Sequence, residues 1–435
     1  MRLVTKVLVL FLVWEVRCDD CAGRECLQQY VARPEPRYRW EDLGLRLEAD
    51  TWTGYILNMT SQQWLSPHLV SRSLWWHQLV VIVPHQVEVT DTALLWVSGM
   101  DNIEDADENI DINNYDIELM SNLAVTNGLV AAVLYQVPNQ PITFAEDALQ
   151  EERREDGIVS FTWWHYLQDD SSDTEYLLRL PMTKATVKAM DTINYFLTDD
   201  TAPDELQGLG LDPSKFIVGG QSKRGWTAWT TATVEPRVVG IIPLVMDELN
   251  FVKNIKHHWQ SYGGWTFVFS DYWKLNITSK WDEPKMQEIF DIVDAFESRD
   301  GMLMPKLVIT AANDEFFLPT DTRYWWQEMP RHEELNRLMI LPNSCHSCIE
   351  ELTARHARRH VLRHWIIFIK FFSPQSDNMT ASHQAVDTQQ LGGSAAVRQG
   401  DAGAELEPRH PHGGHHRHLH LSAGAGGGVV RPLLQ

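Results

Sequence analysis

The 435-residue chain is poor in basic residues, with 37 Lys and Arg against 59 Asp and Glu. Its formal net charge of −22 produces a field that repels phosphate backbones and anionic lipid surfaces. The chain also lacks a repeat at solenoid or propeller period, and no run after its first residues is long enough to span a bilayer. These absences argue against a nucleic-acid partner, membrane insertion and a repeat architecture.

The composition indicates a globular protein with a large core. Apolar residues make up 44% of the chain, charged residues 22%, and there are 18 Trp. A disordered chain of this length would not carry so many aromatic side chains. One domain of ordinary enzyme size can bury a core of this kind.

The first 18 residues resemble a secretory signal peptide. Arg2 and Lys6 form a basic start, residues 7–14 form a short apolar run, and cleavage fits near Cys18. The apolar run is too short to cross a membrane. We therefore expect a secreted, extracellular protein.

Asparagine and cysteine patterns agree with that compartment. Asn58, Asn276 and Asn378 each begin an Asn-X-Ser/Thr acceptor for glycosylation. Removal of Cys18 with the signal leaves an even number of cysteines, for which three disulfide connectivities are possible. One of the three connectivities joins the cysteines that are neighbours in the sequence. A zinc site that uses all four cysteines is an alternative that we favour less. The four are Cys21, Cys26, Cys345 and Cys348.

Short apolar runs rich in β-branched residues alternate with helix-like segments along most of the chain. Runs buried on both faces and separated by helices predict a parallel sheet with crossover connections. The predicted fold class is α/β, with a mostly parallel, doubly wound sheet. The expected strands lie at residues 79–83, 93–97, 129–135, 216–218, 238–244, 306–309 and 338–340.

Counting the signal segment, residues 1–18, this pattern divides the chain into four parts. Residues 19–50 are polar and mixed, and form an N-terminal extension; residues 51–373 form the domain. Residues 374–435 are a His- and Gly-rich tail of low complexity, which we expect to be disordered. The alternative is that the histidines of this tail bind a metal ion, but we favour a solvated tail without a metal site.

Two connections are longer than a plain crossover, at residues 138–179 and 250–304, and both are rich in Trp. Insertions in such a sheet lie beside the carboxyl ends of the strands, where ligands bind. We interpret both segments as helical lids; the alternative is that they are packing helices only.

Ser222 lies between an expected strand and an expected helix, in the sequence Gly220-Gln221-Ser222-Lys223-Arg224-Gly225. A strand, a sharp turn that carries Ser, and a helix form a nucleophile elbow. The usual pattern has glycine two residues after Ser, whereas here that position is Arg224. The alternative is that Ser222 caps the following helix.

Two later residues complete a possible catalytic set. Asp314 follows the expected strand at 306–309, and His346 follows the last one. Ser, Asp and His occur in the order of an α/β-hydrolase triad, and each lies just beyond the carboxyl end of a strand. His346 would take the proton of Ser222, and Asp314 would orient the imidazole. Asp247, after the strand at 238–244, is the alternative acid.

An oxyanion hole requires two backbone N–H groups beside the nucleophile. We expect them from Lys223, which follows Ser222, and from Met100, in the loop after residue 97. Gly99 allows a close approach of the backbone there.

Several separate blocks, in order, resemble the PhoPQ-activated pathogenicity-related family. They are residues 222–227, Asn250, residues 262–265, residues 314–319 and residues 342–347. The resemblance covers about residues 40–372. It implies an α/β-hydrolase fold and a secreted serine hydrolase, and it makes Ser-Lys-Arg-Gly-Trp the family's own form of the elbow. The family includes secreted autocrine proliferation repressor A-like proteins.

We therefore predict a secreted glycoprotein that cleaves an ester or amide bond of a small molecule or peptide through an acyl-Ser222 intermediate. No cofactor and no metal are implied. The competing hypothesis is a secreted signalling protein that binds a cell-surface receptor through the same scaffold, with weak or no catalysis.

Overall fold

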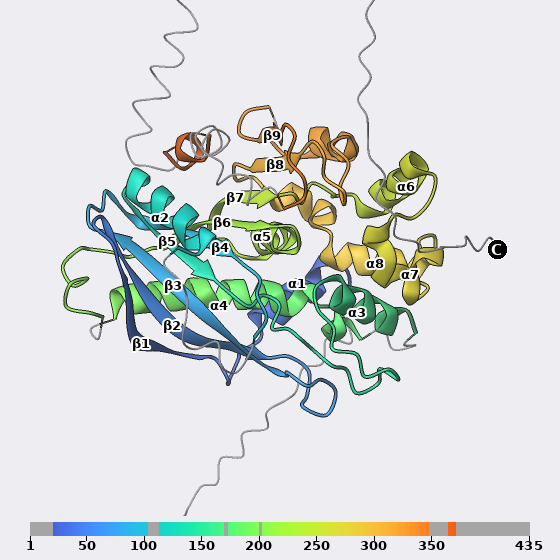
Figure 1. Cartoon of the computed structure of the whole chain (residues 1–435), viewed down its shortest axis with the longest axis horizontal. Helices are drawn as coiled ribbons and strands as arrows, with labels where there is room; N and C mark the ends of the chain where they lie inside the picture. Colours follow the sequence, from blue (N-terminus) through green and yellow to red (C-terminus); the bar gives the residue numbers. More distant parts are fainter. Residues whose placement is uncertain are drawn as a thin grey trace, which may run out of the picture. The chain divides into compact units, whose positions relative to one another are not determined.

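A computed structural model of the chain describes residues 21–102, 113–168, 173–199, 202–331, 333–347 and 364–370. All of these lie in one compact unit, residues 1–379 (Figure 1). The expected signal segment, the tail, Cys348 and Asn378 lie outside the described residues.

Within the described residues, nine strands form one mixed sheet in the order β1-β2-β3-β5-β4-β6-β7-β8-β9. Strands β5, β4, β6, β7, β8 and β9 run parallel, whereas β1, β2 and β3 pair antiparallel, and β3 is antiparallel to β5. The strands are β1 Arg39–Glu48, β2 Trp52–Gln63, β3 Leu74–Pro84, β4 Val89–Val97, β5 Leu129–Leu134, β6 Lys215–Gln221, β7 Val238–Leu244, β8 Leu307–Ala311 and β9 Arg337–Leu341.

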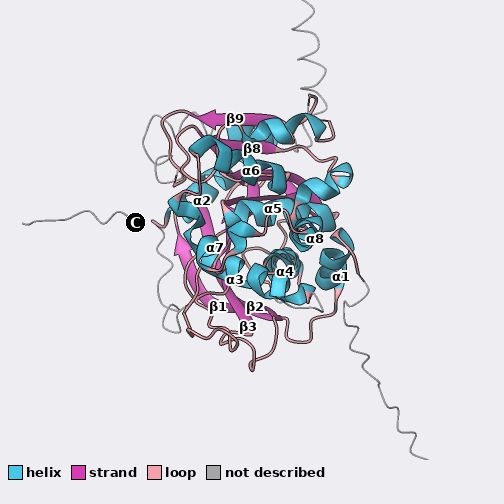
Figure 2. Ribbon diagram, turned by 90° about the vertical axis from the view of Figure 1, so that its right-hand side faces the viewer, coloured by secondary structure: helices cyan, strands magenta, loops and turns pink. Residues whose placement is uncertain are grey.

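Helices cover both faces of the sheet, as Figures 1 and 2 show. Helices α1, α3, α4, α5 and α8 contribute to one hydrophobic cluster, and α2 and residues 364–370 contribute to the other. The helices are α1 Arg24–Ala32, α2 Tyr115–Asn127, α3 Asp156–Gln168, α4 Arg179–Thr198, α5 Lys223–Val234, α6 Phe251–Tyr262, α7 Ser270–Lys274 and α8 Pro284–Val293. Short 3₁₀ helices lie at Thr174–Tyr176, Phe267–Phe269, Ile277–Ser279, Ala295–Gly301, Asp321–Tyr324 and Trp326–Glu328.

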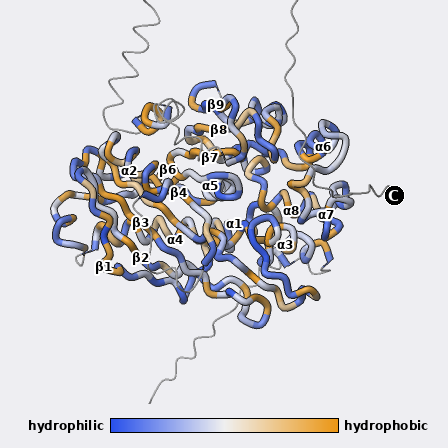
Figure 3. Tube along the Cα trace, viewed as in Figure 1, coloured by the Kyte–Doolittle hydropathy of each residue, from blue (hydrophilic) through white to orange (hydrophobic). Residues whose placement is uncertain are grey.

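Strand β4 shows how the sequence produces this layering. Ala93, Leu95 and Val97 lie in the first cluster, and Leu94 and Trp96 lie in the second. Because successive side chains of a strand point to opposite faces, a continuous apolar run fills both layers. The central strands are accordingly largely hydrophobic in Figure 3. The predicted doubly wound α/β fold is confirmed, and its strand order is that of an α/β-hydrolase.

The sheet begins earlier than expected. Residues 39–63 form β1 and β2, which the sequence did not predict, so the sheet extends into the expected N-terminal extension. Strand β1 is polar because it is an edge strand with both faces partly exposed. Its Arg46 guanidinium bonds to Asp42 and lies 4.5 Å from the Tyr55 ring of β2.

The ladder between β7 and β8 is short. Leu244 pairs with Ile309, Val245 N donates to the Ile309 carbonyl oxygen at 2.7 Å, and an isolated bridge joins Ile241 to Lys306. Strands β8 and β9, in contrast, pair along their full length, from Leu307 to Ala311.

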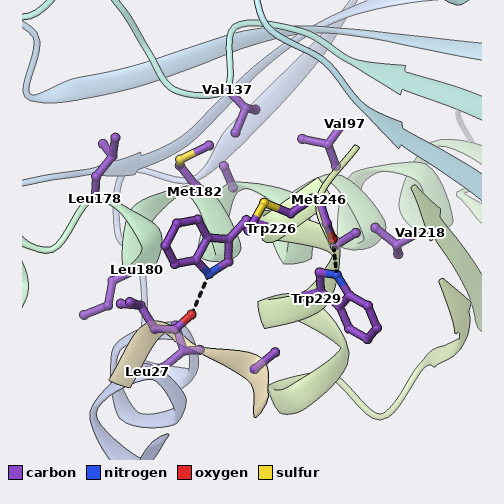
Figure 4. Packing of buried hydrophobic residues seen from close by; sticks show 14 of the residues in the cluster. Leu27, Val97, Val137, Leu178, Leu180, Met182, Val218, Trp226, Trp229 and Met246 are labelled. Atoms are coloured by element: carbon purple, nitrogen blue, oxygen red, sulfur yellow. Dashed lines mark hydrogen bonds between the residues drawn. The ribbon is translucent and has the colours of Figure 1, made fainter. Parts of the chain in front are cut away.

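Two indole N–H groups fix helix α5 against its surroundings. Trp226 Nε1 donates to the Val293 carbonyl oxygen at 2.6 Å, and Trp229 Nε1 donates to the Met246 carbonyl oxygen at 3.0 Å (Figure 4). Both indoles are buried in the larger cluster. The helix that follows Ser222 is thereby held in one position.

The two predicted lid segments pack against each other through aromatic side chains. Trp163 of α3 lies 5.3 Å from Tyr272 and 6.2 Å from Trp281, measured between ring centroids. The interpretation of these segments as lids stays a prediction. In the part of the chain that the structure describes, no helix combines the length and the apolar character needed to span a bilayer.

Candidate active site

Ser222 occupies the turn between β6 and α5 in a conformation that few residues adopt, with φ 53° and ψ −122°. Backbone strain of this kind costs about 1–3 kcal/mol and is concentrated at functional sites. Its side chain makes no capping hydrogen bond to α5. The structure therefore favours the elbow over the alternative in which Ser222 caps the helix.

The glycines around this turn are required by space. A Cβ atom at Gly220 would lie 2.7 Å from the backbone carbonyl group of Arg224, and one at Gly225 would lie 2.8 Å from Met246 Cβ. No real Cβ atom tolerates such contacts without a shift of the neighbouring backbone.

Arg224 takes the place of the usual glycine because its side chain leaves the turn. Its Nη1 donates to Glu155 Oε2 at 2.7 Å, and its Nε donates to the Val137 carbonyl oxygen at 2.6 Å. Burial raises the pKa of Glu155, but the charges of Arg224 and Lys223 outweigh it and hold that pKa at about 2. The guanidinium also fills the space beside Gly99, where a Cβ atom would lie 2.6 Å from Nη2.

The three predicted side chains lie in one hydrogen-bonded series. His346 Nε2 is 2.8 Å from Ser222 Oγ, and His346 Nδ1 is 3.0 and 2.9 Å from the two carboxylate oxygens of Asp314. All three side chains are buried. They reach this point from the ends of β6, β8 and β9, which lie at the same edge of the sheet (Figure 1).

Two further residues hold the histidine loop, and sequence reasoning missed both. Gln221 Nε2 donates to the His346 carbonyl oxygen at 2.8 Å, and Glu315 Oε2 accepts from the His346 N–H at 3.0 Å. Their only signal in the sequence is that each is next to a predicted site residue.

Backbone N–H groups also fix Asp314. Phe316 N and Phe317 N donate to its Oδ1 at 2.8 and 3.0 Å. The rings of these two residues lie 4.3 and 5.5 Å from the imidazole of His346. The acid and the base are therefore both held by the segment that follows β8.

Asp247, the alternative acid, is not joined to His346. Its Oδ1 accepts from Thr310 Oγ1 at 3.0 Å, and its buried Oδ2 has no partner among the described residues. Burial, followed by the charges of Asp321 and Asp314, raises its pKa well above the ordinary range. The structure thus favours Asp314.

Ser222 lines a pocket with a cavity volume of about 40 Å³. Both predicted lid segments contribute to its wall, and the polar groups in the wall besides Ser222 are Asp156, Arg179, Lys223 and Glu248. Most of the remaining wall is aromatic, formed by Trp163, Trp226, Phe251, Phe269, Tyr272, Trp281, Phe316 and Phe317.

The oxyanion assignment stays a prediction. Lys223 is the first residue of α5, so its N–H lies at the positive end of a helix dipole. Its Nζ pairs with Asp156 Oδ2 at 2.7 Å. Met100 has φ 93° and is 46% exposed, and it does not line the pocket.

The remaining predicted sites lie away from the pocket. Cys21 and Cys26 form a disulfide at the start of α1, and Cys345 is half-buried next to His346. Asn276 is exposed, whereas Asn58 lies within β2 and donates to Glu41 Oε1 at 3.3 Å. Within the described ranges no three His, Cys, Asp or Glu side chains are arranged to hold a metal ion.

A sequence model described as "PhoPQ-activated pathogenicity-related protein" matches residues 27–389. The chain belongs to this family. The chain is also similar to the autocrine proliferation repressor protein A of Dictyostelium discoideum, with 36% identity over 321 residues. That alignment covers 74% of this chain and 61% of the relative, so this member of the family spans less than two thirds of that protein's length.

Solved structures with a similar fold include several esterases. An acetyl xylan esterase from Paenibacillus sp. R4 matches with 10% identity and a TM-score of 0.48, over 77% of this chain and 92% of that one. Acetyl xylan esterase 1 from Thermoanaerobacterium sp. JW/SL YS485 matches with 13% identity and a TM-score of 0.45, over 77% and 94%. A glucuronoyl esterase from Solibacter usitatus matches with 13% identity and a TM-score of 0.42, over 75% and 86%.

Proposed function

We propose that this member of the PhoPQ-activated pathogenicity-related family is a serine hydrolase that cleaves an ester or amide bond. The observation that carries the proposal is the hydrogen-bonded series Asp314–His346–Ser222 at the wall of an aromatic pocket. A strained serine within 2.8 Å of an imidazole that a carboxylate orients is the arrangement that acyl transfer requires.

In the first half-reaction, His346 Nε2 removes the Ser222 Oγ proton as Oγ attacks the carbonyl carbon. The tetrahedral intermediate then collapses, and the imidazolium gives its proton to the leaving alcohol or amine. In the second half, His346 deprotonates a water molecule that attacks the acyl-Ser222 ester. The acid product leaves, and Oγ recovers its proton.

Asp314 supports both halves without gaining a proton. Its carboxylate accepts from His346 Nδ1–H, which leaves Nε2 free to act as the base and stabilises the imidazolium. The N–H of Lys223, and that of Met100 if the loop closes on substrate, would stabilise the oxyanion.

Secretion and glycosylation are part of the proposal. The basic and apolar start of the chain supports cleavage after residue 18, and the Cys21–Cys26 disulfide is typical of an oxidising compartment. Asn276 is the best-placed acceptor because it is exposed.

A second candidate function is signalling through a cell-surface receptor, with weak or no catalysis. The 36% identity to an autocrine proliferation repressor protein favours it. The two candidates differ in one respect: only the enzyme needs a reactive Ser222.

Labelling with a fluorophosphonate probe tests the proposal. We expect the wild-type protein to be labelled, Ser222→Ala to be unlabelled, and Ser121→Ala, a change of a buried serine in α2, to be labelled normally. A folded wild-type protein that does not react would refute the hydrolase and leave the signalling candidate.

A further inference from the structure

Arg179 is a buried arginine in the wall of the pocket that Ser222 opens onto. It is 2% exposed and is the first residue of α4. Its Nη1 donates to the carbonyl oxygen of Lys223 at 2.9 Å, which places the guanidinium beside the residue that follows the nucleophile.

The guanidinium lacks the partner that a buried arginine ordinarily has. Within the described ranges no carboxylate forms an ion pair with it, and its Nε has no hydrogen-bond partner. Its other contacts are Met182 Sδ at 3.3 Å and the face of the Trp226 ring at 4.1 Å. A buried charge without a carboxylate partner is rare because desolvation costs several kcal/mol.

Its position in the fold increases that cost. The first residue of a helix lies at the positive end of the helix dipole, where a cation is unfavourable. Burial is the main cause that lowers the pKa of Arg179 to about 10. The charge of Arg224 also lowers this pKa, whereas Tyr272, Asp156 and Glu155 raise it. The side chain nevertheless remains protonated at neutral pH.

The acids of the pocket do not neutralise Arg179. Asp156 uses its two oxygens for Lys223 Nζ, at 2.7 Å, and for the Tyr272 hydroxyl, at 3.0 Å. Burial, and then the charges of Asp321 and Asp247, raise the pKa of Glu248 well above the ordinary range, which favours its uncharged form. Within the described residues Arg179 thus forms no ion pair with these acids, although the charges of Asp156 and Glu155 attract it from a distance.

We propose that the substrate cleaved at Ser222 carries a carboxylate, and that Arg179 binds this group. Nη1 is already bonded to the Lys223 carbonyl oxygen, and the edge formed by Nε and Nη2 carries two parallel N–H donors, of which the buried Nε has no hydrogen-bond partner among the described residues. This geometry fits the two oxygens of a carboxylate. The proposal rests on the hydrolase function and specifies its substrate class.

Two esters that differ only in charge test it: the mono-p-nitrophenyl ester of adipic acid, and the same ester with its free carboxyl methylated. For Arg179→Met we expect kcat/KM on the acidic ester to fall about 10- to 100-fold, as for the loss of hydrogen bonds to a charged group. On the methylated ester we expect a change of less than about threefold, since no carboxylate is there to bind. Arg179→Lys should fall between the wild type and Met, because a point charge replaces the fork.

Arg299→Met is a matched control. Arg299 shares two kinds of contact with Arg179, with its Nη1 2.9 Å from the Phe296 carbonyl oxygen and its guanidinium 4.1 Å from the Phe296 ring. It also pairs with Glu328 at 3.5 Å, and it does not line the pocket. The Arg299→Met variant should leave the ratio of kcat/KM on the two esters unchanged. An equal loss on both esters in Arg179→Met would overturn the proposal and make the residue a packing element.

A binding measurement separates this proposal from the hydrolase function. Monomethyl adipate is titrated into Ser222→Ala protein, and into the same protein with Arg179→Met, while the fluorescence of the pocket tryptophans is followed. Binding that needs Arg179 supports the carboxylate site even if no ester is hydrolysed, a result that would refute the hydrolase alone. Hydrolysis of both esters at equal rates, without such binding, would leave the hydrolase and overturn the carboxylate site.

Discussion

At the scale of single residues, the carboxylate that orients His346 is the clearest distinction that the structure makes. Two acids follow neighbouring strands, but Asp314 lies 2.9 Å from His346 Nδ1, and Asp247 bonds to Thr310 instead. The same chemical group therefore has two different roles, set by what each oxygen contacts.

Asp314→Asn should lower kcat on an activated ester by about 10³- to 10⁴-fold, because the amide favours the wrong tautomer of His346. Thermal unfolding measured beside turnover separates this effect from misfolding. Asp247→Asn is the matched control and should retain kcat within about tenfold. The opposite order of losses would reassign the acid to Asp247.

Sequence reasoning predicted Ser222, Asp314 and His346 as site residues because each follows the end of a strand, which is a local pattern. It did not find Arg179 or Glu155. Their roles depend on contacts between segments that are distant in the chain, such as the pair of Glu155 with Arg224. No spacing rule encodes such contacts.

At the scale of elements, the elbow depends on how closely β6 and α5 approach each other. Gly220 faces the backbone of Arg224, so the space is limited by main-chain atoms that cannot rotate away. The elbow is therefore sensitive to a single added methyl group.

Gly220→Ala should reduce the free energy of unfolding by about 1–3 kcal/mol, the usual cost of overpacking. It should also reduce labelling of Ser222, since the turn must shift. Gly157→Ala is the control: in α3 its Cβ would meet only Arg153 Cβ, at 3.8 Å, so the gain in helix propensity should stabilise by up to about 1 kcal/mol. Urea unfolding of both variants checks this, and equal effects would contradict it.

The strands that sequence reasoning predicted are those with continuous apolar runs, from β3 to β9. It missed β1 and β2 for a physical reason. In β1, charged residues interrupt the apolar ones because this strand is paired on one side only, and only Trp40, Leu43 and Leu47, each partly buried, pack against the hydrophobic clusters. Pairing with β2, rather than composition, makes it a strand.

At the scale of the whole molecule, stability depends on pH through imidazoles that the fold buries. His77 of β3 is fully buried, its ring nitrogens lying 2.9 Å from Ser61 Oγ and 3.0 Å from the Tyr135 carbonyl oxygen. Burial is the main cause that lowers the pKa of His77 to about 4. In the unfolded chain the imidazole of His77 has its ordinary pKa of about 6.5.

Between pH 6.5 and 4 the unfolded state thus binds more protons than the native state, so stability falls as the pH falls. We expect His77 to contribute about 3 kcal/mol to this loss. His77→Gln should therefore show a smaller loss than the wild type, measured by urea unfolding at several pH values. An unchanged pH dependence would show that His77 titrates alike in both states.

The short ladder between β7 and β8 has a consequence for how the site is kept together. Ser222 lies on one side of this joint, and Asp314 and His346 lie on the other, after a two-strand ribbon, β8 and β9, that pairs along its full length. A displacement of that ribbon by one ångström is enough to cost about 10²-fold in rate. In the proposed hydrolase, substitutions along the joint should therefore interrupt proton transfer between Ser222 and His346 while both halves stay folded.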